Sequence, residues 1–389
     1  MGSRSSTRPP DVTPVEDPGK LAEPLVENGC FKNPFPTYRE PTFRNLMSLI
    51  WAFQTQDKSN VPSKEMILNQ TLPMEKPDFK KFESEPGNNL KYMWVGHASC
   101  LVKVDDLTIL TDPVWAQRCG PFGIFGPKRY RDVVCSIEEL PDIDAVVISH
   151  NHYDHLDHSA VKKLNARFQD RLCWFVAQGQ AQWMKDAGCK TVVELSWWGE
   201  HTLKAHGKEY LVAATPTQHW CKRTATDTNK ALWCSWVVKG PRHSFYFAGD
   251  TGYCYAFKQI GRIHGPFSLA AIPIGAYEPR WFMQPQHVNT DEAVEMHKDL
   301  RSEQSVGIHW GTFKLTNEPY MEPKEKLEKI LNLQKLPLSS FVTVKHGEIV
   351  DFLAKSGTNG DTRNTSELIE ETKHMPGTAK QETHGKSNI

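Results

Sequence analysis

Four histidines and two aspartates fall within the ten residues of SHNHYDHLDH, residues 149–158. The ordered pattern inside this stretch is His150-x-His152-x-Asp154-His155. Imidazole and carboxylate groups are common ligands of Zn²⁺. Because the spacing is tight, one loop can direct the first two histidines toward one point and the Asp-His pair toward a neighbouring point. The stretch therefore predicts part of a site for metal ions.

One loop cannot complete two metal sites, so further ligands must come from other elements. Three candidates follow strongly apolar runs: His219 after YLVAATPTQ, Asp250 after FYFAG, and His309 within SVGIHWG. A residue at the end of a strand can face an open site. Taken singly, each is more typical of a structural residue, such as an aspartate that forms a turn. Together with the histidine cluster, we interpret all three as metal ligands.

Alternating strands and helices must position these residues. From residue 90 onwards, short apolar runs such as IDAVVISH and CWFVA alternate with helical segments such as SAVKKLNARF. Two strand-rich halves interspersed with helices predict a layered α/β sandwich. The run FVTVKHGEIVDF near the C-terminus is expected to form one strand.

The segment FRNLMSLIWAF, residues 43–53, predicts a helix that is apolar on nearly every side. We expect this helix to be buried against a core. The alternative is that it lies in a membrane interface or covers an apolar cleft, since it is too short to span a bilayer.

Composition divides the chain into three parts. Residues 1–41 contain eight of the 26 prolines and predict an extended N-terminal arm. Residues 42–353 are expected to form a single catalytic domain, and the polar residues 354–389 to be a disordered tail. The nine cysteines include no CxxC pair, which indicates reduced thiols and an intracellular protein. The net charge of zero argues against nucleic acid as a partner.

The pattern HxHxDH, with the later His, Asp and His at strand ends, resembles the metallo-β-lactamase fold superfamily. That resemblance implies an αββα sandwich of the metallo-β-lactamase type. The stretch LTDP, which contains Asp112, is also similar to a superfamily motif that lies just behind the metals. More narrowly, a series of blocks resembles the N-acylphosphatidylethanolamine-hydrolysing phospholipase D family, in order from about residue 31 to 350. These blocks are WVGHAS, LTDPV, GPKRY, ISHNHYDHLDH, QHWCKRT, FAGDTGYC, AAIPIGAYEPRWFM, QHV and IHWGTF.

The resemblance implies two Zn²⁺ ions and a role for each site residue. One zinc is held by His150, His152 and His219, the other by Asp154, His155 and His309, and Asp250 bridges the pair. Asp112 orients a ligand histidine from behind. His287 is a candidate phosphate contact, with an ordinary loop histidine as the alternative. Gln286, Trp281 and Phe282 are candidate substrate contacts, whereas His97 and His346 are expected to be structural.

Two zinc ions lower the pKa of a shared water and so supply hydroxide at neutral pH. With Asp250, Asp112 and His287 as catalytic residues, the resemblance implies hydrolysis of N-acylphosphatidylethanolamine to N-acylethanolamine and phosphatidic acid. It further implies a homodimer attached peripherally to the cytosolic face of Golgi or endosomal membranes, drawing its substrate from the leaflet.

Two alternatives stay open. The first is a dinuclear zinc hydrolase of the same fold that acts on another phosphodiester or ester, because fold alone does not choose the substrate. The second is a metal-binding scaffold without catalysis that serves in membrane association. The complete set of ligand positions argues against the scaffold.

Overall fold

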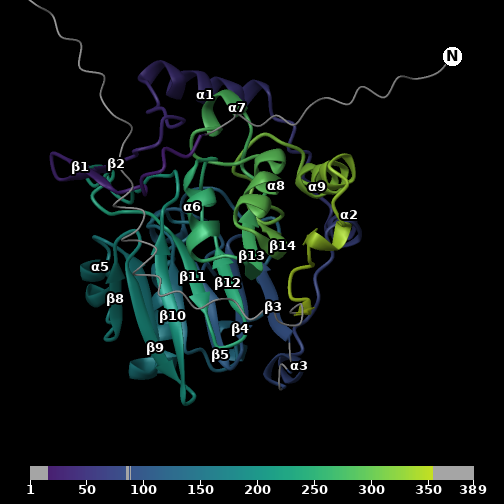
Figure 1. The fold of residues 1–389 in the computed structure, drawn as a ribbon. Helices are drawn as coiled ribbons and strands as arrows, with labels where there is room; N and C mark the ends of the chain where they lie inside the picture. Colours follow the sequence, from purple (N-terminus) through teal and green to yellow (C-terminus); the bar gives the residue numbers. More distant parts are fainter. Residues whose placement is uncertain (1–15, 85–86, 88, 354–389) are drawn as a thin grey trace, which may run out of the picture.

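The computed structural model describes residues 16–84, 87 and 89–353 (Figure 1). Two seven-stranded sheets pack face to face. In spatial order, the first sheet contains β16 (Ile349–Leu353), β3 (Asn89–Gly96), β4 (Ser99–Val104), β5 (Leu107–Thr111), β6 (Ala145–Ile148), β7 (Cys173–Ala177) and β8 (Val192–Leu195). The second contains β15 (Phe341–Val342), β14 (Ser302–Ile308), β13 (Phe267–Pro273), β12 (Ser244–Phe247), β11 (Ser235–Lys239), β10 (Lys208–Thr215) and β9 (Glu200–Ala205).

Helices cover the outer face of each sheet. The helices α4 (His158–Phe168) and α5 (Ala181–Asp186) pack on the first sheet through a separate apolar cluster that includes Leu164 and Met184. On the second sheet lie α6 (Ala256–Ile263) and α8 (Thr290–Asp299), and α9 (Glu322–Leu333) packs beside α8. The main core fills the space between the sheets, where Trp94 and Phe245 are fully buried. The predicted αββα sandwich is confirmed.

Parallel strands bring the carboxyl ends of several strands to one edge of the sandwich. In the first sheet, β5, β6 and β7 are parallel neighbours. In the second, β12, β13 and β14 are parallel, and β10 runs in the same direction because both β10 and β12 are antiparallel to β11. Every predicted metal ligand follows one of these strands, so the topology gathers them at a single edge.

The run FVTVKHGEIVDF does not form one strand. Its first part is β15, which pairs with β14 in the second sheet, whereas its last part is β16, which pairs with β3 in the first. Between them, His346 is fully buried and stacks on Trp94 with 3.9 Å between ring centroids. Gly347 adopts a φ of 82°, a conformation that suits glycine, and its N–H donates to the Trp94 carbonyl. The prediction of one strand is wrong because the chain crosses between the sheets here.

The apolar helix α1 (Phe43–Thr55) forms as predicted but is not buried. It begins with a capping box in which Thr42 and Asn45 bond each other's backbone N–H groups, and only Leu49 and Ala52 are buried. Its exposed apolar side chains are Phe43, Leu46, Met47, Ile50, Trp51 and Phe53. The expected burial is wrong because the helix rests on the outside of an already closed sandwich, at the top of Figure 1, along one narrow stripe.

The segment predicted as an extended arm lies against the sandwich from residue 16 onwards. It contains a short hairpin of β1 (Leu25–Glu27) and β2 (Cys30–Lys32) that the sequence did not indicate. The Gln259 side chain accepts the Ala22 N–H at 3.0 Å. The predicted boundary at residue 41 stays a prediction, and the predicted tail from residue 354 lies outside the described residues.

A buried carboxylate ties the two sheets together at the end opposite the metal ligands. Asp105, in the turn between β4 and β5, accepts the His243 Nδ1–H at 2.6 Å and the Arg242 backbone N–H at 3.0 Å. Burial by itself raises the pKa of the Asp105 carboxyl, but these hydrogen bonds and the nearby imidazole lower the pKa below its ordinary value of 3.8. Asp105 therefore stabilises the sandwich as an anion.

We predict that Asp105→Asn lowers the free energy of unfolding at pH 7 by about 1–3 kcal/mol, because hydrogen bonds to a charged acceptor are lost. Asparagine tolerates the φ of 54° at this position. A lowered folded-state pKa gives stability that is present above the unfolded pKa and is lost as the pH falls through the folded one. Urea unfolding should therefore show a gap between wild type and variant at pH 7 that shrinks below about pH 4.

The matched control is Asp106→Asn, which removes only a partly exposed ion pair with Lys208 and should cost at most about 1 kcal/mol. A gap for Asp105→Asn that is equally large at pH 3 and pH 7 would contradict the assignment.

Candidate metal centre

The histidine cluster forms the loop between β6 and α4. This loop is held from behind by Arg223, whose Nη1 donates to the carbonyls of Asn151 at 2.9 Å and Leu156 at 2.7 Å. The loop ends at Asp157, the N-cap of α4, whose carboxylate accepts the Ser159 N–H. Bonds at both ends of the loop fix the path of the backbone between them, so the ligand side chains have little freedom to move.

The structure brings His150, His152 and His219 together as one group. The Nε2 atom of His150 lies 2.8 Å from Nδ1 of His152, and Nε2 of His219 lies 3.2 Å from the same atom. His150 and His152 come from the loop after β6, and His219 comes from the loop after β10, so both sheets contribute to this group.

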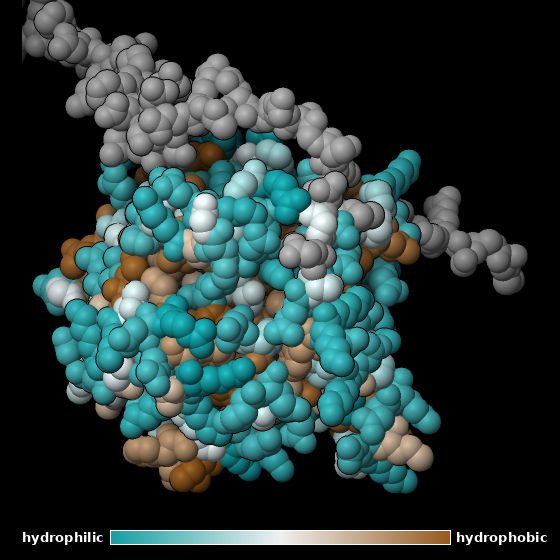
Figure 2. Space-filling model, turned by 90° about the horizontal axis from the view of Figure 1, so that it is seen from below, coloured by the Kyte–Doolittle hydropathy of each residue, from teal (hydrophilic) through white to brown (hydrophobic). Residues whose placement is uncertain are grey.

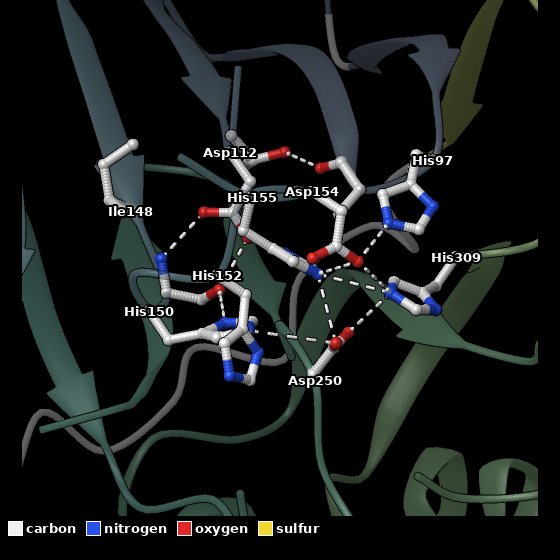
Figure 3. Close-up of polar contacts among 12 residues, drawn as sticks. His97, Asp112, Ile148, His150, His152, Asp154, His155, Asp250 and His309 are labelled. Atoms are coloured by element: carbon white, nitrogen blue, oxygen red, sulfur yellow. Dashed lines mark hydrogen bonds and ion pairs between the residues drawn. The ribbon is translucent and has the colours of Figure 1, made fainter. Parts of the chain in front are cut away.

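A second group contains Asp154, His155 and His309 (Figure 3). The Nε2 atoms of His155 and His309 lie 3.2 Å apart, and Oδ2 of Asp154 lies 3.5 Å and 3.6 Å from them. Asp250 lies between the groups: its Oδ2 is 3.1 Å from His155 Nε2 and 3.9 Å from His150 Nε2. The seven predicted ligands therefore converge as the sequence pattern indicated.

Hydrogen bonds behind the ligands select the imidazole tautomer. Asp112, fully buried at the end of β5, accepts the Ser149 N–H at Oδ1 and the Ser149 hydroxyl at Oδ2. Its Oδ2 also accepts Nδ1–H of His155 at 2.6 Å, and the Ser149 hydroxyl oxygen accepts Nδ1–H of His150 at 2.9 Å. His219 donates its Nδ1–H to the Gln286 carbonyl at 3.0 Å. In each case the Nε2 lone pair is left pointing into the site.

These contacts fit a metal better than a hydrogen-bonded cluster. Lone pairs that face each other at about 3 Å repel unless a cation lies between them. Burial lowers the pKa of His219 to about 3 and of His152 to about 4, so both rings are neutral and able to act as ligands. Burial raises the pKa of the Asp250 carboxyl, but the positive charge of the nearby His155 and His309 rings outweighs burial and holds this pKa well below its ordinary value, so Asp250 is ionised. Despite burial, Asp250 and Asp154 in turn raise the pKa of His309 to about 9, so a metal that binds this ring must displace its proton. The donor set therefore suits cations that prefer nitrogen and carboxylate oxygen.

The predicted substrate contacts lie within residues 281–287, a segment that reaches His219 and Asp250. His287 is buried, with its Nε2 atom 3.9 Å from Oδ2 of Asp250 and its ring 5.3 Å from that of His219. Gln286 accepts the Trp220 indole N–H at 2.6 Å. In the short helix α7 (Arg280–Met283), Trp281 is exposed and Phe282 is partly exposed.

Sequence reasoning missed several residues that position the ligands. His97, which was expected to be structural, lies with Nε2 3.0 Å from Oδ2 of Asp154 and so belongs to the second group. Ser149, directly before the cluster, links Asp112 to His150. Arg223 packs over the Tyr153 ring at 4.2 Å. The quoted blocks WVGHAS and QHWCKRT contain His97 and Arg223, but only the folded chain shows what the two side chains contact. His346 packs in the core, away from the ligands.

Comparison with known proteins identifies the class. The profile of the "Beta-lactamase superfamily domain" matches residues 108–310. Two solved structures share the fold: a metallo hydrolase from Ignicoccus hospitalis (TM-score 0.51, 22% identity, 69% of this chain and 100% of that chain) and a possible metal-dependent hydrolase from Veillonella parvula (TM-score 0.53, 17% identity, 67% and 98%). The chain is a metal-dependent hydrolase of the beta-lactamase superfamily.

Two relatives that match this chain over most of their length identify its family. The chain is 42% identical over 352 residues to N-acyl-phosphatidylethanolamine-hydrolyzing phospholipase D 1 of Caenorhabditis elegans, covering 88% of this chain and 98% of the relative. It is 33% identical over 344 residues to the mitochondrial N-acyl-phosphatidylethanolamine-hydrolyzing phospholipase D of Saccharomyces cerevisiae, covering 79% and 72%. The chain belongs to the N-acyl-phosphatidylethanolamine-hydrolyzing phospholipase D family. The prediction of an enzyme, a phosphodiester hydrolase, is confirmed.

We predict that Asp112→Asn weakens metal binding about 10–100-fold. In either orientation the amide nitrogen of asparagine would face a donor: the Ser149 N–H on one side, or the Ser149 hydroxyl and the His155 N–H on the other. Competition with a chromogenic chelator measures the change directly, without reference to turnover. The control is Asp132→Asn, since Asp132 is an exposed carboxylate that bonds only Gln117 in the described structure. Equal metal affinity of Asp112→Asn and wild type would contradict the orienting role.

Proposed function

We propose that the chain is a zinc-dependent phospholipase D that hydrolyses N-acylphosphatidylethanolamine to N-acylethanolamine and phosphatidic acid. The observation that carries the proposal is the convergence of two ligand groups on Asp250, in a chain whose relatives are named for this reaction. Two zinc ions, one in each group, would supply Lewis acidity and a water of lowered pKa.

The residues of the chain orient the reactants in this proposal. Asp250 touches both groups and fixes their spacing. His287 lies beside Asp250, and its buried Nδ1 atom has no hydrogen-bond partner among the described residues. We assign to His287 a contact with a phosphoryl oxygen, where an imidazole N–H offsets part of the developing charge. His97 and Asp112 keep Asp154 and His155 in place during the reaction.

Exposed apolar side chains support peripheral membrane association. They gather on α1, on α7 and on the loop of residues 122–125, close to the edge of the sandwich that holds the predicted metal ligands. By contrast, the end of the sandwich opposite α1 is largely hydrophilic (Figure 2). Exposed apolar side chains that gather on one side of a protein are typical of an interaction site. No helix in the described part of the chain is long and apolar enough to cross a membrane. We propose that this apolar side enters the leaflet that holds the substrate.

Homodimer formation and attachment to Golgi or endosomal membranes on the cytosolic face stay predictions. The alternative of a dinuclear hydrolase with another phosphodiester or ester substrate is tested by the same experiment as the lipid proposal.

The zinc-analysed protein should release N-acylethanolamine and phosphatidic acid together from mixed phospholipid vesicles that contain N-acylphosphatidylethanolamine. Mass spectrometry identifies the products. Asp250→Asn should lower the rate at least about 10³-fold because it removes the carboxylate shared by both groups, whereas Asp132→Asn should keep the wild-type rate. Two bound zinc ions with every lipid intact would contradict the substrate assignment and favour the alternative.

Replacing Phe43 and Trp51, which are 79% and 59% exposed, with serine should reduce the fraction of protein that sediments with the same vesicles. The loss of apolar area weakens partition into the leaflet. Zinc content should not change, because neither residue lies near the ligands. Leu333→Ser on α9, also exposed, is the control. Equal vesicle binding of all three proteins would rule out α1 as the membrane contact.

A further inference from the structure

Three loops of the metal centre meet at Gln218, which directly precedes the predicted ligand His219. Gln218 is fully buried, and it bonds to each of the other two loops through its backbone or its side chain. The loops follow β10, β12 and α7. Each carries one predicted site residue, and these are His219, Asp250 and His287, respectively. A residue that bonds all three loops can set how these side chains lie relative to one another.

The backbone of Gln218 joins the first two loops. Its N–H donates to the Thr251 hydroxyl oxygen at 2.9 Å, and its carbonyl accepts the Gly252 N–H at 2.8 Å. The Thr251 carbonyl in turn accepts the Val288 N–H at 2.7 Å, which connects the third loop to the second. Asp250, directly before Thr251, therefore lies on backbone that is bonded to both neighbouring loops.

The side chains of Gln218 and His219 bond two successive carbonyls of the third loop. Gln218 donates its Nε2–H to the Pro285 carbonyl at 2.8 Å, and His219 donates its Nδ1–H to the Gln286 carbonyl at 3.0 Å. The next residue along this loop is His287. The position of residues 285–286 therefore determines both the tautomer of His219 and the place of His287.

The loops approach each other closely where the Gln218 amide binds. A Cβ atom on Gly252 would lie 2.6 Å from the Pro285 carbonyl oxygen and 2.7 Å from Gln218 Nε2, so only glycine fits here. The amide bond therefore forms between loops that pack with no room for a further side chain.

The N-terminal arm bonds the same pair of residues from outside. The Thr37 hydroxyl donates to Gln218 Oε1 at 2.5 Å, and Asn33 donates its Nδ2–H to the His219 carbonyl at 2.8 Å. Because the Pro285 carbonyl can only accept, the Gln218 amide must present Nε2 there and Oε1 to Thr37. The hydroxyl of Thr37 thus holds the amide in the orientation that bonds the third loop.

We propose that Gln218 is a positioning residue that keeps His219 in its ligand orientation and His287 beside Asp250, and that the arm completes this arrangement through Thr37. The proposal rests on the proposed function and deepens it, because it gives the arm a part in forming one of the two zinc sites. Since His219 belongs to only one ligand group, the effect of Gln218 on zinc should be confined to that group.

The test removes the partners of this bond chain one at a time on the full chain. Gln218→Met keeps the length of the side chain and loses the amide, whereas Thr37→Val keeps the shape and loses the hydroxyl. Anomalous diffraction from crystals equilibrated at a series of zinc concentrations gives the occupancy of each ligand group separately. Competition with a chromogenic chelator gives the affinities in solution.

Three further variants are controls. Thr37→Ser keeps a hydroxyl at the same position. Gln54→Met and Thr55→Val make the same changes of side chain at exposed positions of α1, where the Thr55 hydroxyl bonds only the Trp51 carbonyl of its own helix in the described structure. All three should keep the wild-type zinc affinity within about twofold.

We expect Gln218→Met to weaken zinc binding at the group of His219 about tenfold or more, because the carbonyl that orients this ring is no longer held in place. The affinity of the group of His309 should change less than about threefold. Thr37→Val should weaken the group of His219 about threefold, since Gln218 can still bond Pro285. The double variant should match Gln218→Met within about twofold, because Thr37 acts through the amide.

Wild-type zinc affinity of Gln218→Met and of Thr37→Val at the group of His219 would overturn the proposal. An equal loss at both ligand groups would also overturn it, since that result marks a general loss of structure. Losses that add in the double variant would overturn the part assigned to the arm. If Gln218→Met does not fold, Thr37→Val decides alone: a loss confined to the group of His219 supports the proposal, and any other result overturns it.

Zinc binding needs no turnover, so the two proposals fail separately. Variants that lose zinc from the group of His219 as expected, in a chain that hydrolyses no N-acylphosphatidylethanolamine, would overturn the proposed function alone. Hydrolysis by wild type, with both variants binding zinc as wild type does, would overturn the role of Gln218 alone.

Discussion

The buried carboxylate of Asp112 is the interaction on which the rest of the centre depends. One group accepts three hydrogen bonds, two from Ser149 and one from His155, and Ser149 in turn accepts from His150. Without this acceptor, no hydrogen bond would fix the tautomers of His150 and His155 that point their Nε2 lone pairs into the site. A fully buried charge is costly unless it is satisfied in this way. The carboxylate at one strand end therefore orients one ligand histidine in each group.

The order and direction of the strands in the sandwich determine where the ligand loops meet. Parallel strands in both sheets end at the same edge, which lets loops that are far apart in the sequence meet around Asp250. The arm closes this edge from outside through the bond from Asn33 to the backbone of the His219 loop. The exposed apolar side chains of α1 lie next to α7, whose chain continues into His287 beside Asp250 (Figure 1).

Periodicity and motif spacing were enough to predict the sandwich and the convergence of the seven ligands, because strand ends and a tight histidine pattern are local features. They failed where tertiary context decided the outcome. The helix at residues 43–55 has the composition of a core helix, yet the closed sandwich left it no place in the core. The run from residue 341 changes sheets before β16, and His346, in the crossing segment, packs on Trp94. His97 contacts Asp154 across the fold, a pairing of residues 57 positions apart that no local pattern indicates.

The central claim is that two metal ions bind in one centre that shares Asp250. Crystals of the zinc-loaded protein, with diffraction recorded on either side of the zinc absorption edge, test it directly. The account predicts two anomalous peaks, one among His150, His152 and His219 and one among Asp154, His155 and His309, with Asp250 in contact with both. A single peak, or two peaks of which either lies away from these groups, would contradict it.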